Sequence, residues 1–418
     1  MNLLLKSAII VDSTSPYHLQ KKDILIENGI ITKIASVIKN EEGIEELKLK
    51  NLHISKGWFD TSVSFGEPGF EERETIKNGL LTASKSGFTK VAVNSNTNPV
   101  LDTNADIEFI VNKCNNSATK LFPIGSLTKG SEGKDLAELY DMQNSGAIAF
   151  GDYNKPLTNS NLLKIALQYV QNFNGLVLSF PQDQAIAGHG VVNEEINSTK
   201  LGLKGIPALA EELQIARDLF ILEYTGGKLH IPTISTANSV KLIKEAKKKN
   251  LDVTCSVAGH HLVLTDDELV HFDSNTKVMP PLRTKRDIKA LLKGVQEGVI
   301  DVITSDHNPI DVEHKKVEFD NAKYGTIGLE SLFGALNPVL ELEVLINCLT
   351  ENPCKIFQVK NSSIREGEKT DITLFNPEYS YKFEVNNILS TSKNSIFLGK
   401  EMNGKVYGIF ANNQLILS

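Results

Sequence analysis

The sequence predicts an α/β protein in which a (β/α)₈ TIM-like barrel carries a small β-sandwich domain formed from both chain termini. Two observations support this fold class. From residue 57 to about residue 304, apolar segments of strand length alternate with amphipathic segments of helix length. Both ends of the chain contain strand-like segments instead. We therefore expect residues 1–55 to form the first part of the sandwich, residues 56–350 the barrel, and residues 351–418 a linker and the remainder of the sandwich.

The N-terminal segment has the pattern of short strands separated by turns. Residues 3–11 and 23–34 are rich in residues that favour strands, and the ENG sequence at 27–29 predicts a turn inside the second stretch. Residues 47–54 predict a further strand. No helix in this segment is long enough to pack a core, so we expect it to be one part of a small β domain.

Eight short apolar segments predict the barrel strands: residues 58–63, 89–93, 120–124, 147–150, 176–180, 228–231, 253–257 and 299–304. Segments with helical periodicity lie between them, including residues 72–86, 162–171, 208–224, 237–249 and 285–297. Eight strands alternating with helices over about 250 residues is the pattern of a (β/α)₈ barrel. A doubly wound open sheet is the structural alternative, but no Gly-x-Gly-x-x-Gly motif follows the first strand to support dinucleotide binding.

After residue 353 the chain becomes strand-like again. Residues 371–375, 405–410 and 414–417 predict three strands. A chain that begins and ends with strands around a central barrel can build one sandwich from both termini.

The composition is that of an ordinary globular protein, with 41% hydrophobic and 23% charged residues among 418. A net charge of −7 without a basic patch gives no support for binding to nucleic acid or to an acidic membrane surface. The apolar start of the chain is too short for a signal peptide, and no apolar run approaches the roughly 20 residues of a membrane span. We therefore expect a cytoplasmic protein. Its four cysteines are scattered, which predicts buried free thiols rather than a disulfide framework.

A series of short motifs runs through the barrel segment. The first is GWFDTSVSFGEPG at residues 57–69, and it is followed by NSNTNP at 94–99, LTKG at 127–130, AFGD at 149–152, LGLKGIP at 201–207, KVMPPLR at 277–283, SDHNP at 305–309 and GLES at 328–331. In number, order and spacing these motifs resemble those of the cyclic amidohydrolases, above all the dihydroorotases, from about residue 57 to about residue 410. The resemblance implies an amidohydrolase barrel with a split β-sandwich and a role in de novo pyrimidine biosynthesis.

The resemblance also places the family's metal site on this sequence. Zinc-dependent opening of a cyclic amide needs about three protein ligands and an open coordination position. The four positions that match the family's metal-binding histidines hold Ser62, Ser64, Phe180 and Thr233. Two acids of the family site, Asp152 and Asp306, remain. We therefore expect no zinc and no other cofactor, although two carboxylates with several waters could hold a harder ion such as magnesium.

The substrate-binding positions are partly retained. The family holds the dihydroorotate carboxylate with an arginine, whose planar fork pairs a carboxylate through two hydrogen bonds, and with an asparagine. Gly66 stands at the arginine position, whereas Asn96 matches the asparagine. Met279 stands where a further substrate-contacting asparagine is expected. The resemblance leaves Asn96, His260 and Arg283 as candidate substrate-binding residues, with a structural role near the barrel mouth as the alternative for His260.

Asp306 is the candidate catalytic base. It precedes His307, but adjacent residues on an extended strand point to opposite faces, so a direct dyad is not expected. The alternative is a retained aspartate that hydrogen-bonds backbone or water in an emptied site, because a general base needs a positioned partner. Lys129 invites comparison with a carbamylated lysine that bridges two metals, but without nearby imidazoles we expect a surface lysine.

Two functions follow from the resemblance. The first is a non-catalytic dihydroorotase homologue that acts as a structural or regulatory partner of aspartate transcarbamoylase, because all four imidazoles and the carboxylate-binding arginine are absent together. The second is an active dihydroorotase, which hydrolyses dihydroorotate reversibly to N-carbamoyl-aspartate, or a related cyclic amidohydrolase with an atypical zinc site. In either case we expect a homo-oligomer.

Overall fold

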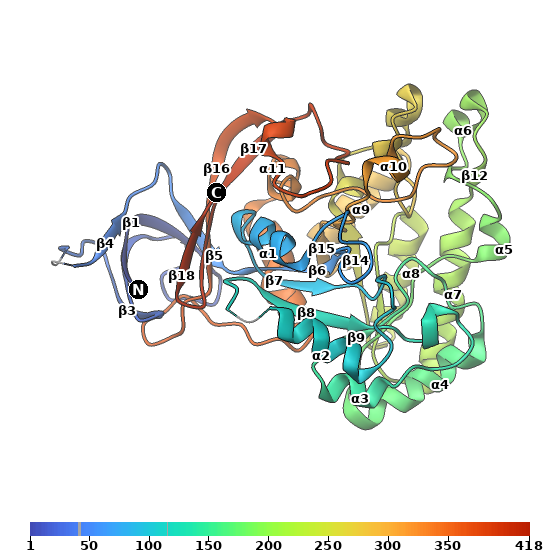
Figure 1. Ribbon diagram of the computed structural model, residues 1–418, viewed down its shortest axis with the longest axis horizontal. Helices are drawn as coiled ribbons and strands as arrows, with labels where there is room; N and C mark the ends of the chain where they lie inside the picture. Colours follow the sequence, from blue (N-terminus) through green and yellow to red (C-terminus); the bar gives the residue numbers. More distant parts are fainter. Residues whose placement is uncertain (41–42, 115) are drawn as a thin grey trace.

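The structure is a computed structural model that describes residues 1–40, 43–114 and 116–418. Eight parallel strands form its central barrel and follow one another around it in chain order (Figure 1). They are β6 (Trp58–Val63), β7 (Phe88–Val93), β8 (Lys120–Gly125), β9 (Ala149–Phe150), β10 (Val177–Leu178), β13 (Leu229–Ile231), β14 (Val253–Ala258) and β15 (Val302–Thr304). Each overlaps a segment in which the sequence predicts a barrel strand, and the (β/α)₈ fold class is confirmed.

The barrel closes between its first and last strands. A bridge joins Val63 at the end of β6 to His307 beyond β15, and the amide of Ser64 donates to the carbonyl of His307 over 2.7 Å. The buried carboxylate of Asp60, on β6, accepts a hydrogen bond of 3.0 Å from the amide of Ser305. This closure holds the loops after β6 and β15 together, and both loops carry predicted site residues.

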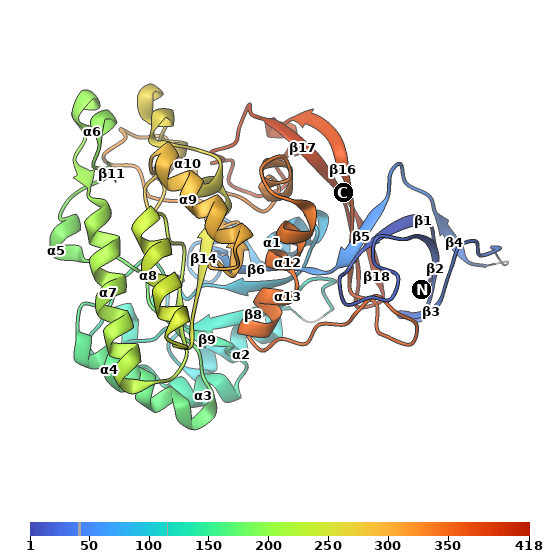
Figure 2. The same cartoon turned by 180° about the vertical axis from the view of Figure 1, so that it is seen from behind.

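Helices cover the outside of the barrel (Figure 2). The longer ones are α1 (Ile76–Lys85), α2 (Asn104–Lys113), α4 (Ser160–Val170), α7 (Ala208–Thr225), α8 (Ala237–Lys248) and α9 (Lys285–Gln296). The predictions for α4, α7, α8 and α9 agree with these bounds to within one or two residues. Helix α1 begins later than predicted because Thr75 caps it, with its side chain accepting the amide of Asn78.

Shorter elements fill the loops. They are α3 (Leu139–Asn144), α5 (Gln184–Ala187), α6 (Ile196–Leu201), α10 (Val312–Lys315), α11 (Leu332–Leu336), α12 (Leu342–Leu349), α13 (Glu351–Ile356), and the parallel pair β11 (Val192–Asn193) and β12 (Gly205–Ile206). After α13, Phe357 packs on Phe59 of β6 with ring centroids 5.8 Å apart. Within the described ranges, no helix is both long enough and apolar enough to cross a membrane.

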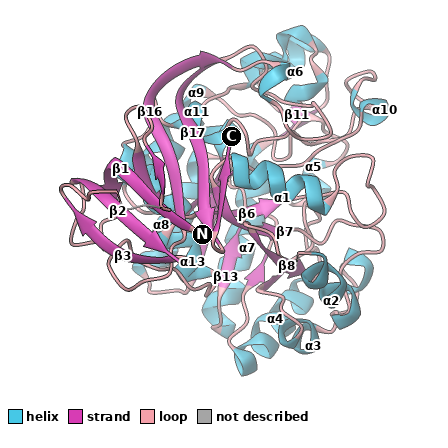
Figure 3. Cartoon of the chain, turned by 60° about the vertical axis from the view of Figure 1, so that its left-hand side comes forward, coloured by secondary structure: helices cyan, strands magenta, loops and turns pink. Residues whose placement is uncertain are grey.

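The two chain ends form a separate sheet at one end of the molecule (Figure 3). Its strands are β1 (Asn2–Val11), β2 (Lys21–Glu27), β3 (Ile30–Ala35), β4 (Glu45–Leu47), β5 (His53–Lys56), β16 (Ile372–Lys382), β17 (Glu401–Ala411) and β18 (Gln414–Leu417). β5 pairs in parallel with β1 and antiparallel with β16, so the C-terminal strands extend the N-terminal ones. Apolar side chains from both ends, such as Leu5, Ile54 and Phe410, share one core. The predicted domain built from both termini is confirmed.

The junction between this sheet and the barrel depends on Gly57. A Cβ atom on it would lie 2.0 Å from Oγ1 of Thr89 and 2.1 Å from Oδ1 of Asp371, so the close approach requires glycine. The next residue, Trp58, is the only tryptophan of the chain and is fully buried. Its indole N–H donates to Oγ of Ser55 over 2.9 Å. One buried aromatic residue is thus tied to both parts of the structure.

Candidate functional site

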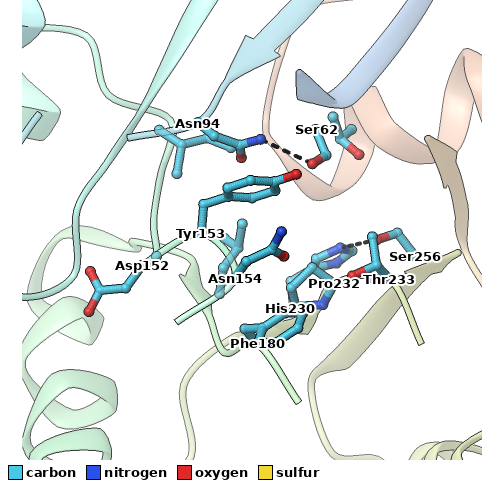
Figure 4. Close-up of a pocket in the computed structure, with 14 residues that line it drawn as sticks. Ser62, Asn94, Asp152, Tyr153, Asn154, Phe180, His230, Pro232, Thr233 and Ser256 are labelled. Carbon is cyan, nitrogen blue, oxygen red and sulfur yellow. Dashed lines mark hydrogen bonds between the residues drawn. The ribbon is translucent and has the colours of Figure 1, made fainter. Parts of the chain in front are cut away.

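The carboxyl ends of the barrel strands converge on a small cavity (Figure 4). Its polar lining residues are Thr61, Ser62, Asn94, Asp152, Tyr153, Asn154, His230, Thr233 and Ser256. Its volume of about 30 Å³ gives space for about two water molecules. In (β/α)₈ barrels this end of the strands carries the active site, so we take this cavity as the candidate site.

Asp306 connects three barrel strands beside the cavity. Its Oδ1 accepts a hydrogen bond of 2.9 Å from Oγ of Ser62, at the end of β6, and one of 3.1 Å from the hydroxyl of Tyr153, after β9. The φ angle of Asp306 is +47°, a left-handed conformation that aspartate adopts more readily than most residues. The sequence predicts Asp306 as a site residue but does not point to Tyr153, whose only local signal is its position after Asp152.

Burial shifts the protonation of this group. It raises the pKa of Asp306 to about 7; the hydrogen bonds from Ser62 and Tyr153 oppose the rise, and the charge of Asp60 adds to it. Burial also raises the pKa of Tyr153 well above its usual value, so the phenol is neutral. At neutral pH Asp306 is therefore partly protonated. A carboxyl group with this pKa can accept or donate a proton under physiological conditions.

The other retained acid, Asp152, is hydrogen-bonded to a neighbouring loop at residues 126–128. Its carboxylate accepts hydrogen bonds from the hydroxyls of Ser126 (2.6 Å) and Thr128 (2.5 Å). It also accepts the amides of Leu127 (2.9 Å) and Thr128 (3.1 Å). In Figure 4 its carboxylate points away from the Tyr153 hydroxyl. The two acids retained from the family site therefore bond different partners.

The two serines that replace the first-strand histidines belong to a network of neutral polar groups. Nδ2 of Asn94 donates to Oγ of Ser62 over 3.1 Å, and Oγ of Ser64 donates to Oδ1 of Asn96 over 3.0 Å. Asn96, predicted to bind substrate, thus contacts Ser64 and is not part of the cavity lining.

The fifth-strand histidine position is apolar in this chain. Phe180 is 4% exposed and shares one apolar cluster with Met279, Ile206 and Ala210. Phe180 replaces a metal ligand of the family, and Met279 replaces a substrate-contacting asparagine. The residues that replace a metal ligand and a substrate-binding residue therefore pack together in one hydrophobic cluster, which excludes water from this wall of the site.

The sixth-strand position places a different histidine at the cavity. Thr233 has a left-handed backbone conformation with φ of +49°, and its amide donates to Oγ of Ser256 over 3.1 Å. His230, three residues earlier, lines the cavity, with Nδ1 2.9 Å from Oγ1 of Thr254 and Nε2 3.2 Å from Oγ of Ser256. Burial lowers the pKa of His230 to about 3, so its ring is neutral. The sequence did not single out His230, because a lone strand histidine is also typical of a structural residue.

Arg283, predicted to bind substrate, is used inside the protein. Its Nη1 donates to Oδ1 of Asn193 (2.8 Å) and to the carbonyl of Ile206 (2.9 Å), and its Nε donates to Oγ of Ser235 (3.0 Å). Its Nη2 lies 3.8 Å from the buried carboxylate of Glu211. The guanidinium holds the segment before α7 and the start of α8, and it does not line the cavity.

The remaining histidines lie outside the cavity lining. The ring of His260 stacks on His261, with centroids 4.4 Å apart, in the turn after β14. Nδ1 of His307 accepts the amide of Gly328 over 3.2 Å, and its Nε2 has no partner among the described residues. His307 therefore forms no dyad with Asp306, in agreement with the expectation for adjacent residues on an extended segment.

The donor set does not fit a zinc site. Across residues 1–40, 43–114 and 116–418, no group of three or more His, Cys, Asp or Glu side chains is placed to hold a metal ion. Zinc requires about three such ligands. The magnesium alternative needs both retained acids at one point, and the carboxylate of Asp152 is bonded elsewhere. Lys129 is exposed, as expected for a surface lysine, and the four cysteines are free thiols, of which Cys255, Cys348 and Cys354 are buried.

Comparison with solved structures supports the fold. The fold matches L-hydantoinase (dihydropyrimidinase) from Arthrobacter aurescens with a TM-score of 0.86 over 100% of this chain and 96% of that one. It matches dihydropyrimidinase from Brevibacillus agri NCHU1002 with a TM-score of 0.84 over 100% and 95%. At 18% sequence identity these matches show the fold alone, a (β/α)₈ barrel with a β-sandwich domain.

Sequence comparison identifies the family within this class. The family model described as dihydro-orotase-like matches residues 53–239. The chain is 38% identical to the dihydroorotase of Pelotomaculum thermopropionicum over 100% of this chain and 99% of that protein. It is 37% identical to the dihydroorotase of Geobacter metallireducens over 97% and 96%. The chain belongs to the dihydroorotase family.

Proposed function

We propose that this chain is a dihydroorotase-family protein of de novo pyrimidine biosynthesis that does not open the ring itself and acts as a structural or regulatory partner of aspartate transcarbamoylase. The observation that carries the proposal is the state of the family's metal-ligand positions. The hydroxyl of Ser62 donates a hydrogen bond to Asp306, and the carboxylate of Asp152 accepts hydrogen bonds from the loop at residues 126–128. Phe180 lies in an apolar cluster. Hydrolysis of a cyclic amide needs an activated hydroxide, and these residues offer no set of ligands for the metal that would supply it.

The substrate side of the site supports the same proposal. A Cβ atom on Gly66 would lie 1.8 Å from the carbonyl oxygen of Phe70, so no side chain fits at the position where the family has its arginine. The amide of Phe70 donates to the carbonyl of Gly66 over 2.8 Å, and the amide of Gly66 donates to Glu74 over 2.9 Å. This turn is built around glycine. The dihydroorotate carboxylate would therefore lose the bidentate cation that recognises it in the family.

The size of the cavity agrees with this view. Its volume is about 30 Å³. Sites for small organic ligands usually enclose several hundred Å³, roughly 300–1,000 Å³. The side chains of Tyr153 and Phe180 take up part of the space at the barrel mouth. A cavity of this volume suits water rather than a six-membered ring with its substituents.

An active dihydroorotase, or a related cyclic amidohydrolase with an atypical metal site, is the second candidate function. Two observations favour it. Curated relatives named dihydroorotase match the whole chain at 35–38% identity. The pKa of Asp306 is about 7, which suits a general base at neutral pH.

A turnover assay combined with metal analysis separates the two candidates. The purified chain is incubated with dihydroorotate and added zinc, and N-carbamoyl-aspartate is measured, with the Pelotomaculum thermopropionicum dihydroorotase in parallel. We expect no turnover above the uncatalysed rate and fewer than about 0.1 zinc per chain, because the ligand set is incomplete. Zinc-dependent turnover that is lost in Asp306→Ala would instead establish the active enzyme and overturn the proposal.

The partner role is tested separately. Aspartate transcarbamoylase from the same cells is mixed with the chain and the mixture is separated by size-exclusion chromatography. We expect the two proteins to elute together at a mass above that of either alone. Separate elution, together with an absence of any change in transcarbamoylase activity or thermal stability, would remove the partner role.

A further inference from the structure

A second cavity lies between the barrel and the terminal sheet, and we call it the junction cavity. Its volume is about 420 Å³. Its walls come from the first residues of β7 and β8, the segment between α13 and β16, and the turns at residues 28–30 and 411–413. Figure 1 shows the terminal sheet beside the end of the barrel at which the strands begin. The junction cavity is therefore at the opposite end of the barrel from the candidate site.

Three lysines line the junction cavity without a carboxylate partner. They are Lys120, at the start of β8, and Lys360 and Lys369, in the segment before β16. All three are exposed, and no ion pair joins them to a carboxylate in residues 1–40, 43–114 and 116–418. The acidic residue of the described wall, Asp371, is ion-paired with the buried Lys90. The wall therefore carries an excess of positive charge.

This excess is local. The chain as a whole has a net charge of −7. The larger cavity beside α10, of about 790 Å³, is lined by four carboxylates and three lysines and has no such excess. Like charges that folding holds near one another repel, and an anion placed between them removes that repulsion. The junction cavity is therefore complementary to an anionic ligand.

The donors of the cavity suit a phosphate group. The lysine ammonium is a compact charge with three donors and is a common phosphate ligand, whereas a carboxylate is better matched by the planar fork of arginine. A phosphate monoester carries a charge of about −1.5 to −2 at pH 7 and has three strong acceptor oxygens, which three ammonium groups can share. The wall also contains Thr370, which is 4% exposed and whose Oγ1 has no partner among the described residues. An acceptor oxygen from a ligand would satisfy that hydroxyl.

The rest of the cavity is suited to an organic group. Its wall includes the apolar side chains of Ile30, which is 40% exposed, and of Ala118 and Ala411, which are each 4% exposed. Its volume lies within the roughly 300–1,000 Å³ that is usual for sites of small organic ligands. Inorganic phosphate alone would leave most of that space and the apolar wall unfilled.

We propose that the junction cavity binds a phosphorylated small molecule of about the size of a nucleoside monophosphate. The phosphate lies among Lys120, Lys360 and Lys369, and the organic part packs against the apolar wall. Such a ligand contacts both the barrel and the segment that leads into the terminal sheet, so its binding stabilises the junction between them. The inference goes beyond the proposed function and does not depend on it, because this cavity requires neither ring opening nor transcarbamoylase.

Isothermal titration calorimetry of the full chain tests the site, with adenosine 5′-monophosphate, adenosine and inorganic phosphate as probes. We expect the monophosphate to bind with a dissociation constant below about 1 mM. Adenosine should give no measurable binding at about 5 mM because it lacks the charge that the lysines recognise. Inorganic phosphate should bind at least about tenfold more weakly than the monophosphate, because it leaves the apolar wall uncovered. Raising sodium chloride from about 20 mM to about 500 mM should weaken the monophosphate at least about tenfold by screening.

Charge-removing variants locate the binding. Lys360→Gln and Lys369→Gln should each raise the dissociation constant of the monophosphate at least about fivefold, since each removes one charged hydrogen-bond donor. Lys129→Gln is the matched control, because it makes the same change at an exposed lysine in the loop after β8, at the other end of the barrel. It should leave the constant unchanged. Far-ultraviolet circular dichroism shows whether each variant is folded.

Four results would overturn the inference. The first is the absence of binding of both the monophosphate and inorganic phosphate to wild type at about 5 mM. The second is equal affinity for adenosine and its monophosphate, which would show that the phosphate is not recognised. The third is equal affinity for inorganic phosphate and the monophosphate, which would exclude the contact between the organic part and the apolar wall. The fourth is an unchanged dissociation constant in both folded lysine variants, which would place the binding elsewhere on the chain.

Discussion

Asp306→Asn should stabilise the protein at alkaline pH and have little effect at acid pH. The side chain is buried and its pKa is raised to about 7, against 3.8 for an ordinary aspartate. Asparagine has the same shape, its Oδ1 can accept the hydrogen bonds from Ser62 and Tyr153, and it tolerates the left-handed φ of this position. The substitution therefore removes the ionisation without removing the contacts.

The magnitude follows from proton linkage. Below pH 3.8 both the folded and the unfolded chain carry the proton, and the ionisation contributes nothing. As the pH rises toward 7, the unfolded chain releases the proton while the folded chain keeps it, so wild-type stability falls. The loss reaches about 4 kcal/mol once the pH is above both pKa values, and about 2.5 kcal/mol of it falls between pH 5 and pH 8.

Urea unfolding of wild type and Asp306→Asn at pH 5, 6, 7 and 8 measures this difference, with the fluorescence of Trp58 as the probe. We expect the difference in free energy of unfolding, variant minus wild type, to increase by about 2.5 kcal/mol between pH 5 and pH 8. A difference between the two proteins that is the same at all four pH values would refute the reasoning. Asp152→Asn is the matched control and should destabilise the protein at pH 8 by about 1–3 kcal/mol. The reason is that both carboxylate oxygens of Asp152 accept hydrogen bonds, and in asparagine one of these oxygens is replaced by an NH₂ group that cannot accept them.

Two further predictions concern buried polar contacts away from the cavity. Arg283→Met should lower the free energy of unfolding by about 3–5 kcal/mol, because it leaves the carboxylate of Glu211 buried without its cation. Lys244→Met, at an exposed ion pair, should leave the melting temperature unchanged, and an equal loss in both variants would contradict this view of Arg283. Ser55→Ala should cost about 1–3 kcal/mol, because it removes the acceptor of the Trp58 indole N–H. Urea unfolding measures that loss, and an unchanged midpoint would show that the bond contributes nothing.

Most of the barrel could be predicted because strand and helix signals are local. An apolar run of strand length between turn residues indicates a buried parallel strand wherever it lies in the chain. The start of α1 was placed too early, because the cap at Thr75 outweighed the amphipathic pattern that begins before it. The sheet made from both termini was predicted from composition, but its continuity through the pairing of β5 with β16 depends on contacts between residues about 300 positions apart.

The site was only partly predictable for the same reason. The sequence shows directly that Ser62 and Phe180 stand where the family has histidines. It does not show that Asp306 accepts hydrogen bonds from Ser62, which lies 244 residues away in the sequence, and from Tyr153, which lies 153 residues away. The loop that takes up the carboxylate of Asp152 is likewise outside any local pattern. The sequence shows directly which residue replaces which at each position. It does not show the contacts that take the place of the metal site, because they form between segments that are distant in the sequence.

The sequence by itself determined the family, the fold class, the kind and order of the barrel elements and the absence of the four imidazoles. Each of these depends on residue identity, or on patterns within a few neighbouring positions. Only the tertiary structure decided which partners bond Asp152 and Asp306, that Arg283 is used internally, and which face of α7 is buried. Helix α7 carries large apolar residues on both its buried and its exposed face, so periodicity alone could not say which face is buried. That choice depends on partners such as Ser179, Ser235 and Arg283, which folding brings to the helix from other parts of the chain.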